Sequence, residues 1–170
     1  MIFINIGSNL NSVYGSRLEN LKKAIILIIN EKIMINKISS IYETPSYPNK
    51  RKPKFLNICI EISTLKKPLT LLKCLKKIEK KLFRRNSLRN QPRTCDIDLI
   101  DYNGKLANTK ILSLPHPRAH LRNFVLYPLH EISPNWFHPV LNKKIEFLIK
   151  KLNFKVRNEI TRLNESVIIE

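Results

Sequence analysis

The chain has 170 residues, of which 43% are hydrophobic, and its 31 Lys and Arg residues outnumber 13 Asp and Glu residues to give a formal net charge of +18. This length is enough for one domain with a substantial core, residues 1–170, and the hydrophobic content excludes a disordered chain. Because no apolar run approaches the roughly 18 residues of a membrane helix, we expect no membrane-spanning segment.

The first third of the chain predicts a strand, a helix and a second strand. Residues 2–6 alternate Ile with Phe and Asn up to a turn, and apolar residues then recur at helical spacing from Leu18 to Ile29. Residues 32–43 are expected to form one long strand, with a bulge or bend near Asn36 where the apolar phase slips. Prolines and basic residues over 44–54 indicate a loop.

The rest of the chain continues this alternation of strands and helices. Residues 55–64 predict a strand, and a helix is expected from Pro68 to about residue 82. A flexible basic loop over 83–92 then leads to a strand over 95–102. Beyond these elements we expect short helical turns over 118–132, a helix over 143–152 and a tail over 153–170 of uncertain role.

This element order predicts the fold class. Strand, helix, strand, strand, helix, strand is the ferredoxin-like βαββαβ arrangement, an α+β fold with an antiparallel sheet and helices on one face. The other face is expected to be open for a ligand, and the C-terminal residues form an extension.

Two carboxylates, Asp96 and Asp98, stand one residue apart in the strand of residues 95–102, shortly after Arg93. On a strand this spacing puts both acids on one face, while Ile97 and Leu99 point to the other. Two carboxylates on one surface repel each other, so they predict a divalent cation, and Mg²⁺ suits oxygen ligands beside substrate phosphates. The alternative is that the pair only lines a solvated strand face.

The strict alternation of residues 55–62 points to a second site. Leu56 and Ile58 share one face of this strand, so Phe55 and Asn57 project together toward the open side. An aromatic ring beside an amide suits a flat heterocycle, because the ring stacks and the amide forms directional hydrogen bonds.

The histidines and cysteines give weaker signals. His116 and His120 are four residues apart, but a helix does not readily carry Pro117 between them, so a zinc pair is disfavoured. The three cysteines include no Cys-x-x-Cys pair and predict reduced, mostly buried thiols in a cytoplasmic protein.

Several short motifs occur in the order and approximate spacing of one family. They are Gly7-Ser8-Asn9-Leu10, Tyr42-Glu43-Thr44-Pro45, Phe55-Leu56-Asn57, the arginines 84, 85 and 89, Pro92 to Asp98, Pro115-His116-Pro117-Arg118 and Arg122 to Leu126. Over about residues 1–140 the chain resembles the 6-hydroxymethyl-7,8-dihydropterin pyrophosphokinases. The resemblance implies transfer of the β,γ-diphosphate of ATP to the hydroxymethyl group of the dihydropterin, with release of AMP, in folate biosynthesis.

The resemblance also implies a role for each matched residue. The pterin would be bound by Thr44, Pro45, Phe55, Asn57 and Phe124. ATP would be bound by Lys76, Glu79, Arg84, Arg93, His116 and Arg122. Two Mg²⁺ ions would be held by Asp96 and Asp98, and the catalytic residues would be Arg84, Arg93, Asp96 and Asp98. Asp98 is also the best candidate for a general base.

The chain departs from the family in the loop that covers the site. Phe83 replaces a glycine, Asn86 a common second arginine, and Asn90 and Gln91 a Trp-Gly pair. We therefore expect altered closure or turnover, while the predicted fold is unaffected.

The net charge raises a different class of function. A basic RNA-binding domain on a ferredoxin-like sheet would present aromatic and basic side chains on the sheet face, but the two carboxylates there would repel phosphate without a metal. The chain is rich in Lys, Ile and Asn, as expected from drift toward A/T-rich codons, so the positive charge need not reflect selection for binding. We therefore expect no nucleic-acid partner. We also expect a monomer. A third reading is another metal-dependent nucleotidyl- or phosphotransferase that lacks the pterin pocket.

Overall fold

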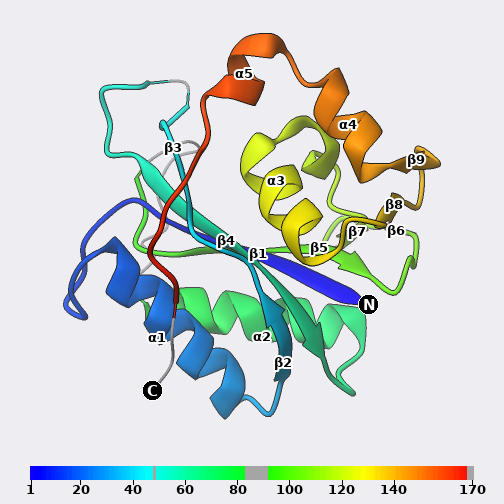
Figure 1. The fold of residues 1–170 in the computed structure, drawn as a ribbon. Coiled ribbons are helices and arrows are strands. Elements are labelled where there is room, and N and C mark those ends of the chain that lie inside the picture. The colour runs from blue at the N-terminus through cyan, green and yellow to red at the C-terminus, as the bar shows by residue number, and fades with distance from the viewer. Residues whose placement is uncertain (48, 83–91, 168–170) are drawn as a thin grey trace.

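The computed structural model describes residues 1–47, 49–82 and 92–167, and it shows a mixed α/β fold (Figure 1). The strands of the main sheet are β1 (Ile2–Ser8), β2 (Met34–Ile38), β3 (Tyr42–Thr44), β4 (Phe55–Ser63), β5 (Asp96–Tyr102) and β10 (Thr161–Arg162). The helices are α1 (Arg17–Asn30), α2 (Pro68–Lys81), α3 (Asn123–Ile132), α4 (Ile145–Lys151), α5 (Phe154–Asn158) and the 3-10 turn η1 (Ala119–Leu121). Two small hairpins pair β6 (Ala107–Asn108) with β7 (Ser113–Leu114) and β8 (Phe137–His138) with β9 (Lys143–Lys144).

The main sheet is antiparallel and has the order β10-β3-β4-β1-β5, with β2 also paired to β4. The predicted α+β class with an antiparallel sheet is confirmed. The central strand β1 is buried along its whole length, because β4 and β5 flank it and helices pack on the sheet.

The first core lies between the sheet and the pair of helices α1 and α2, and local sequence signals set both helices. Ser16 and Glu19 form a capping box at the start of α1, and Pro68 occupies the first turn of α2. The core between these helices and the sheet includes Ile4, Ile6, Leu21, Ile25, Ile58, Ile60, Leu75, Ile78, Ile97 and Leu99.

The predicted open face is wrong over most of its area. Phe3, Cys59 and Ile100 lie on that face and are fully buried, because α3 and α4 pack over them (Figure 1). Apolar side chains at these positions need cover from water, and the apolar face of α3 supplies it. Among the described residues, one end of this face carries polar side chains in place of the apolar ones and stays open.

The predicted long strand over 32–43 is also wrong, because it divides into β2 and β3. The expected bulge is confirmed at Asn36, since Ile35 pairs with Ile62 while Lys37 pairs with Glu61. A second irregularity follows Ile38, where the backbone N–H of Cys59 bonds to the Ser39 side chain at 3.0 Å instead of continuing a regular ladder.

The C-terminal third is more ordered than the sequence predicted. The expected short turns over 118–132 form η1 and the ten-residue helix α3, and the tail returns to the sheet as β10 beside β3. The predicted helix over 143–152 is confirmed as α4, which begins at Ile145 after strand β9. Arg84 and the loop substitutions at 83, 86, 90 and 91 lie outside the described residues.

All three cysteines are described, and each is a buried free thiol, as predicted. Within the described ranges, no helix combines the length and apolar character needed to cross a bilayer.

Candidate active site

A cavity of about 890 Å³ lies at the open end of the sheet. Its position follows from strand register: Gly7 near the end of β1 pairs with Asn57 on one side and with Asp96 on the other, and Asn5 pairs with Asp98. The antiparallel sheet therefore brings the predicted heterocycle residues and the predicted metal ligands to one place. The predicted site residues that line the cavity are Thr44, Pro45, Phe55, Asn57, Lys76, Glu79, Arg93, Asp96, Asp98, His116, Arg122 and Phe124.

Gly7 has a steric role between these two groups. A Cβ atom at this position would lie 3.0 Å from Oδ1 of Asn57 and 3.6 Å from the Phe55 ring. The absence of a side chain at Gly7 therefore lets Asn57 and Phe55 lie close against β1.

Each of the two β5 carboxylates that line the cavity, Asp96 and Asp98, has an arginine beside it. Arg93 Nη1 lies 2.6 Å from Oδ2 of Asp96, and Arg122 Nη1 lies 3.0 Å from Oδ2 of Asp98. Ile97 is in the core on the opposite face, so the predicted division of the strand into an acidic face and an apolar face is confirmed. The arginines offset the repulsion between the two acids within the protein itself.

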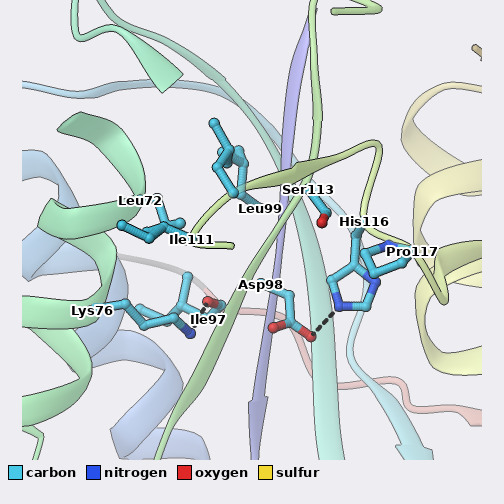
Figure 2. A pocket seen from close by; sticks show the side chains of 10 residues that line it. Leu72, Lys76, Ile97, Asp98, Leu99, Ile111, Ser113, His116 and Pro117 are labelled. Atoms are coloured by element: carbon cyan, nitrogen blue, oxygen red, sulfur yellow. Dashed lines mark hydrogen bonds and ion pairs between the residues drawn. The ribbon is translucent and has the colours of Figure 1, made fainter. Parts of the chain in front are cut away.

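His116 faces the same carboxylate. Its Nε2 atom lies 3.7 Å from Oδ2 of Asp98 (Figure 2). Its Nδ1 atom accepts a hydrogen bond from the backbone N–H of Arg118 at 3.2 Å. Burial lowers the pKa of His116, and Arg122 and Arg118 lower it further, against the opposing effect of Asp98. Because Nδ1 accepts from the backbone of Arg118, the ring N–H of His116 is at Nε2, the atom that faces the carboxylate.

His120 does not join His116. Its ring instead packs edge to face against His138, with the ring centres 5.5 Å apart. Across the described part of the chain no group of three or more His, Cys, Asp or Glu side chains could hold a metal ion. The two predicted ligands, Asp96 and Asp98, both line the main cavity.

The opposite wall of the cavity carries the aromatic residues. Asn57 is only 2% exposed and its side-chain amide donates to Oγ1 of Thr44 at 3.1 Å, which fixes the orientation of the amide. Phe124 lies at the start of α3, and the guanidinium carbon of Arg122 is 5.3 Å from its ring centre. When its amide is oriented to donate, Asn5 bonds to the carbonyls of Phe124 and Ile58 at 3.1 Å and so ties α3 to the sheet.

Glu79 and Lys76 line the cavity, yet both also hold the backbone of β5. The Glu79 carboxylate is 3% exposed and accepts from the backbone N–H of Ile97 at 2.6 Å and from Lys76 at 2.9 Å. Lys76 also donates to the Ile97 carbonyl at 3.1 Å. Between them these contacts fix the strand that carries the two aspartates.

Asn9 is a site residue that sequence reasoning missed. Its side chain donates to Ser46 and to the Pro53 carbonyl, both at 3.1 Å, and accepts from the backbone N–H of Arg93 at 2.7 Å. It therefore joins three segments that are distant in sequence. Its only signal was its place in the short run Gly7-Ser8-Asn9-Leu10, which is too weak alone to reveal these contacts.

A smaller cavity of about 190 Å³ adjoins the main one (Figure 2). Leu72, Leu99 and Ile111 give it apolar walls, and Lys76, Asp98 and His116 line both cavities. An apolar recess thus opens beside the charged centre of the site.

Comparison with known proteins places these features in one family. Residues 3–134 match the family described as 7,8-dihydro-6-hydroxymethylpterin-pyrophosphokinase (HPPK). The chain is 35% identical over 145 residues to the 2-amino-4-hydroxy-6-hydroxymethyldihydropteridine pyrophosphokinase of Aquifex aeolicus, covering 85% of this chain and 88% of the relative. It is 38% identical over 131 residues to the enzyme of the same name from Bacillus subtilis, covering 76% of each.

A solved structure shares the fold. Plasmodium falciparum HPPK-DHPS, crystallised with pteroate, has a TM-score of 0.70 at 17% identity and covers 95% of this chain. The present chain spans 45% of that larger protein.

Proposed function

Because the chain belongs to the 7,8-dihydro-6-hydroxymethylpterin-pyrophosphokinase family, we propose that its main cavity holds both substrates around Asp96 and Asp98. The chain transfers a pyrophosphoryl group from ATP to hydroxymethyldihydropterin in folate biosynthesis. The observation that carries the proposed arrangement is a single cavity with paired carboxylates between an aromatic wall and a basic wall.

The pterin is placed in the part of the cavity bounded by Phe55, Phe124 and Asn57, with Thr44 and Pro45 at its edge. Two aromatic side chains suit a flat heterocycle, and the buried amide of Asn57 offers directional hydrogen bonds to the edge of its ring. Support comes from the hydrogen bond to Thr44, which holds that amide in place before a ligand arrives.

ATP is placed along the basic wall, with its base in the smaller apolar cavity beside Leu72 and Ile111. Apart from the lysines of the loop between Thr44 and Phe55, the described cationic side chains that line the main cavity suit a polyphosphate, and they are Lys76, Lys80, Arg93, Arg118 and Arg122. We include Arg84 in this set because it matches the family's motif, and we expect Glu79 to act mainly by holding β5.

The donor set fits Mg²⁺. Asp96 and Asp98 present carboxylate oxygens to the cavity from one face of a strand, and Mg²⁺ takes carboxylate oxygens together with substrate phosphates and water. We propose that these two residues hold two Mg²⁺ ions. When bound, the ions neutralise phosphate charge and stabilise the attacking and leaving oxygens.

The protein's own contribution is positioning and electrostatic stabilisation, which supply most of the rate in phosphoryl transfer. The hydroxymethyl oxygen bonds to the β-phosphorus of ATP, the bond from that phosphorus to the bridging oxygen of the α-phosphate breaks, and AMP leaves. Arg93 and Arg122 stabilise the charge that develops on the polyphosphate, and the N–H of His116 donates a hydrogen bond to it. Asp98 receives the hydroxyl proton.

We also propose a strand topology, a domain organisation and an oligomeric state for the chain. The order β3-β4-β1-β5 and the position of α1 and α2 support a ferredoxin-like βαββαβ unit to which α3, α4 and the tail are added. We propose that residues 1–170 form one domain that acts as a cytoplasmic monomer.

The test is product analysis with ATP and Mg²⁺, in the presence and absence of 6-hydroxymethyl-7,8-dihydropterin. We expect AMP and the pterin diphosphate in equal amounts, formed only when the pterin is present. ADP as the sole nucleotide product would contradict the proposal.

A further inference from the structure

The C-terminal strap, defined as residues 153–163, forms part of the cavity wall. Val156 and Glu159 line the main cavity, although both lie beyond residue 134, where the family match ends. In Figure 1 the chain turns at α5 above α3 and runs back beside β3. The strap therefore reaches the substrate site.

Residues near both ends of helix α3 hold the strap. Near the cavity, the Asn123 side chain donates to the Val156 carbonyl at 2.5 Å and the Tyr127 hydroxyl donates to the Arg157 carbonyl at 3.3 Å. At the far end, Arg162 forms an ion pair with Glu131 at 3.0 Å. The helix that presents Phe124 to the cavity thus also holds the strap.

The strap also contacts the opposite wall. The Glu159 carboxylate pairs with the ammonium group of Lys50, which belongs to the segment of residues 49–54. That segment leads to Phe55, a residue of the pterin side of the cavity, and Lys50 itself lines the cavity. One ion pair therefore connects the aromatic wall on α3, through the strap, to this segment on the other side.

We propose that Lys50 and Glu159 are positioning residues for the dihydropterin: their ion pair fixes residues 49–54 against the strap and so sets the width of the pterin pocket. This inference rests on the proposed function. The pair lies on the pterin side, while the smaller cavity for the base of ATP lies beyond Asp98 and His116, so the ion pair should affect one substrate selectively. Both side chains are partly exposed, at 48% and 29%, so the effect should be modest.

The test compares Lys50→Gln, Glu159→Gln and the reversed pair Lys50→Glu with Glu159→Lys. Each single variant should raise KM for the dihydropterin about two- to fivefold, the range for a partly exposed ion pair, with KM for ATP unchanged. The reversed pair should restore KM to near the parent value. Glu31→Gln is the matched control, because it removes a partly exposed ion pair to Lys81 at 3.8 Å that lies outside the cavity.

Hydrogen exchange of residues 154–163 provides a readout that does not depend on turnover. The single variants should exchange faster than the parent in this segment, and the reversed pair should exchange at the parent rate. Unchanged exchange and unchanged KM in the single variants would overturn the proposal, as would a reversed pair no better than the single variants. Failure of the parent to form AMP would instead contradict the proposed function, and exchange would still test the ion pair.

Discussion

Arg122 Nη1 lies 3.0 Å from Oδ2 of Asp98. The same guanidinium group stands 5.3 Å from the ring centre of Phe124. One side chain thus connects the strand that carries the paired carboxylates to the aromatic wall of the proposed pterin pocket. The guanidinium group forms an ion pair with the carboxylate and a cation–π contact with the ring. These two contacts keep it at the boundary between the two proposed substrate positions.

Asn57→Ala should weaken binding of the dihydropterin and leave Mg·ATP binding unchanged. The substitution removes the hydrogen-bonding amide from the pocket, and we expect a loss of about 1–3 kcal/mol. Titration calorimetry with each ligand separately measures both effects. Equal losses for the two ligands would mean that Asn57 acts on the fold of the whole cavity.

Gly7→Ala should also weaken pterin binding, about tenfold, because the new Cβ would press on Oδ1 of Asn57 at 3.0 Å. A double-mutant cycle isolates this cause. With Asn57→Ala already present, Gly7→Ala should add much less, since the crowded oxygen is gone. Additive losses in the double variant would rule out this steric explanation.

Glu79→Ala should destabilise the protein by about 1–3 kcal/mol, because it leaves the buried N–H of Ile97 without its carboxylate acceptor. Thermal unfolding should show the loss, and KM for ATP should rise because β5 is less firmly held. Glu31→Ala, at the end of α1, is a control that should change Tm little. Parent-like stability of Glu79→Ala would show that the carboxylate does not brace β5.

Local periodicity explains what the sequence predicted well. Alternation of period two placed Asp96 and Asp98 on one face of β5 and Phe55 and Asn57 on one face of β4, and both placements depend only on neighbours along the chain. The bulge at Asn36 was visible for the same reason, as a slip in the apolar phase.

What the sequence did not reveal depends on contacts between distant segments. The cover of Phe3 and Cys59 by α3 needs a helix more than sixty residues away from either, and their apolar character does not indicate which element covers them. Asn9 acts by joining residues 46, 53 and 93, and Glu159 acts through Lys50. No spacing rule along the chain encodes such pairings.

The free energy of unfolding of the protein should fall as the pH decreases below about 6.5, in part because of His138. Burial lowers the pKa of this residue, followed by the effect of His120, while Asp101 opposes them. As the pH falls, His138 therefore binds a proton in the unfolded chain, near pH 6.5, before it does so in the folded chain. Its contribution to the free energy of unfolding is fully present above that pH and is lost as the pH falls toward the folded pKa.

His138→Asn tests this cause. The Nδ1 atom of His138 accepts from the backbone N–H groups of Val140 and Leu141 at 3.3 and 3.2 Å, and an Asn side-chain oxygen keeps an acceptor near that position without titrating. Tm measured at pH 7.5 and 5.5 should differ less in the variant than in the parent. An equal pH dependence in both proteins would exclude His138 as a source.

The central claim is that Asp96 and Asp98 form the chemical centre of pyrophosphoryl transfer, and three substitutions on one strand test it most directly. Asp101→Asn is the matched control, because Asp101 bonds to Trp136 at 2.8 Å and does not line the cavity. Each Asp96→Asn and Asp98→Asn protein should lose nearly all pterin-dependent AMP formation, while its stability changes by no more than about 1 kcal/mol because the acids are partly exposed.

The decisive measurement is therefore kcat for AMP formation together with Tm for these three variants. We expect opposite patterns: Asp96→Asn and Asp98→Asn keep Tm and lose kcat, whereas Asp101→Asn lowers Tm and keeps kcat. Retention of kcat within about tenfold of the parent, or about 1.4 kcal/mol of barrier, in Asp96→Asn and Asp98→Asn would contradict the claim.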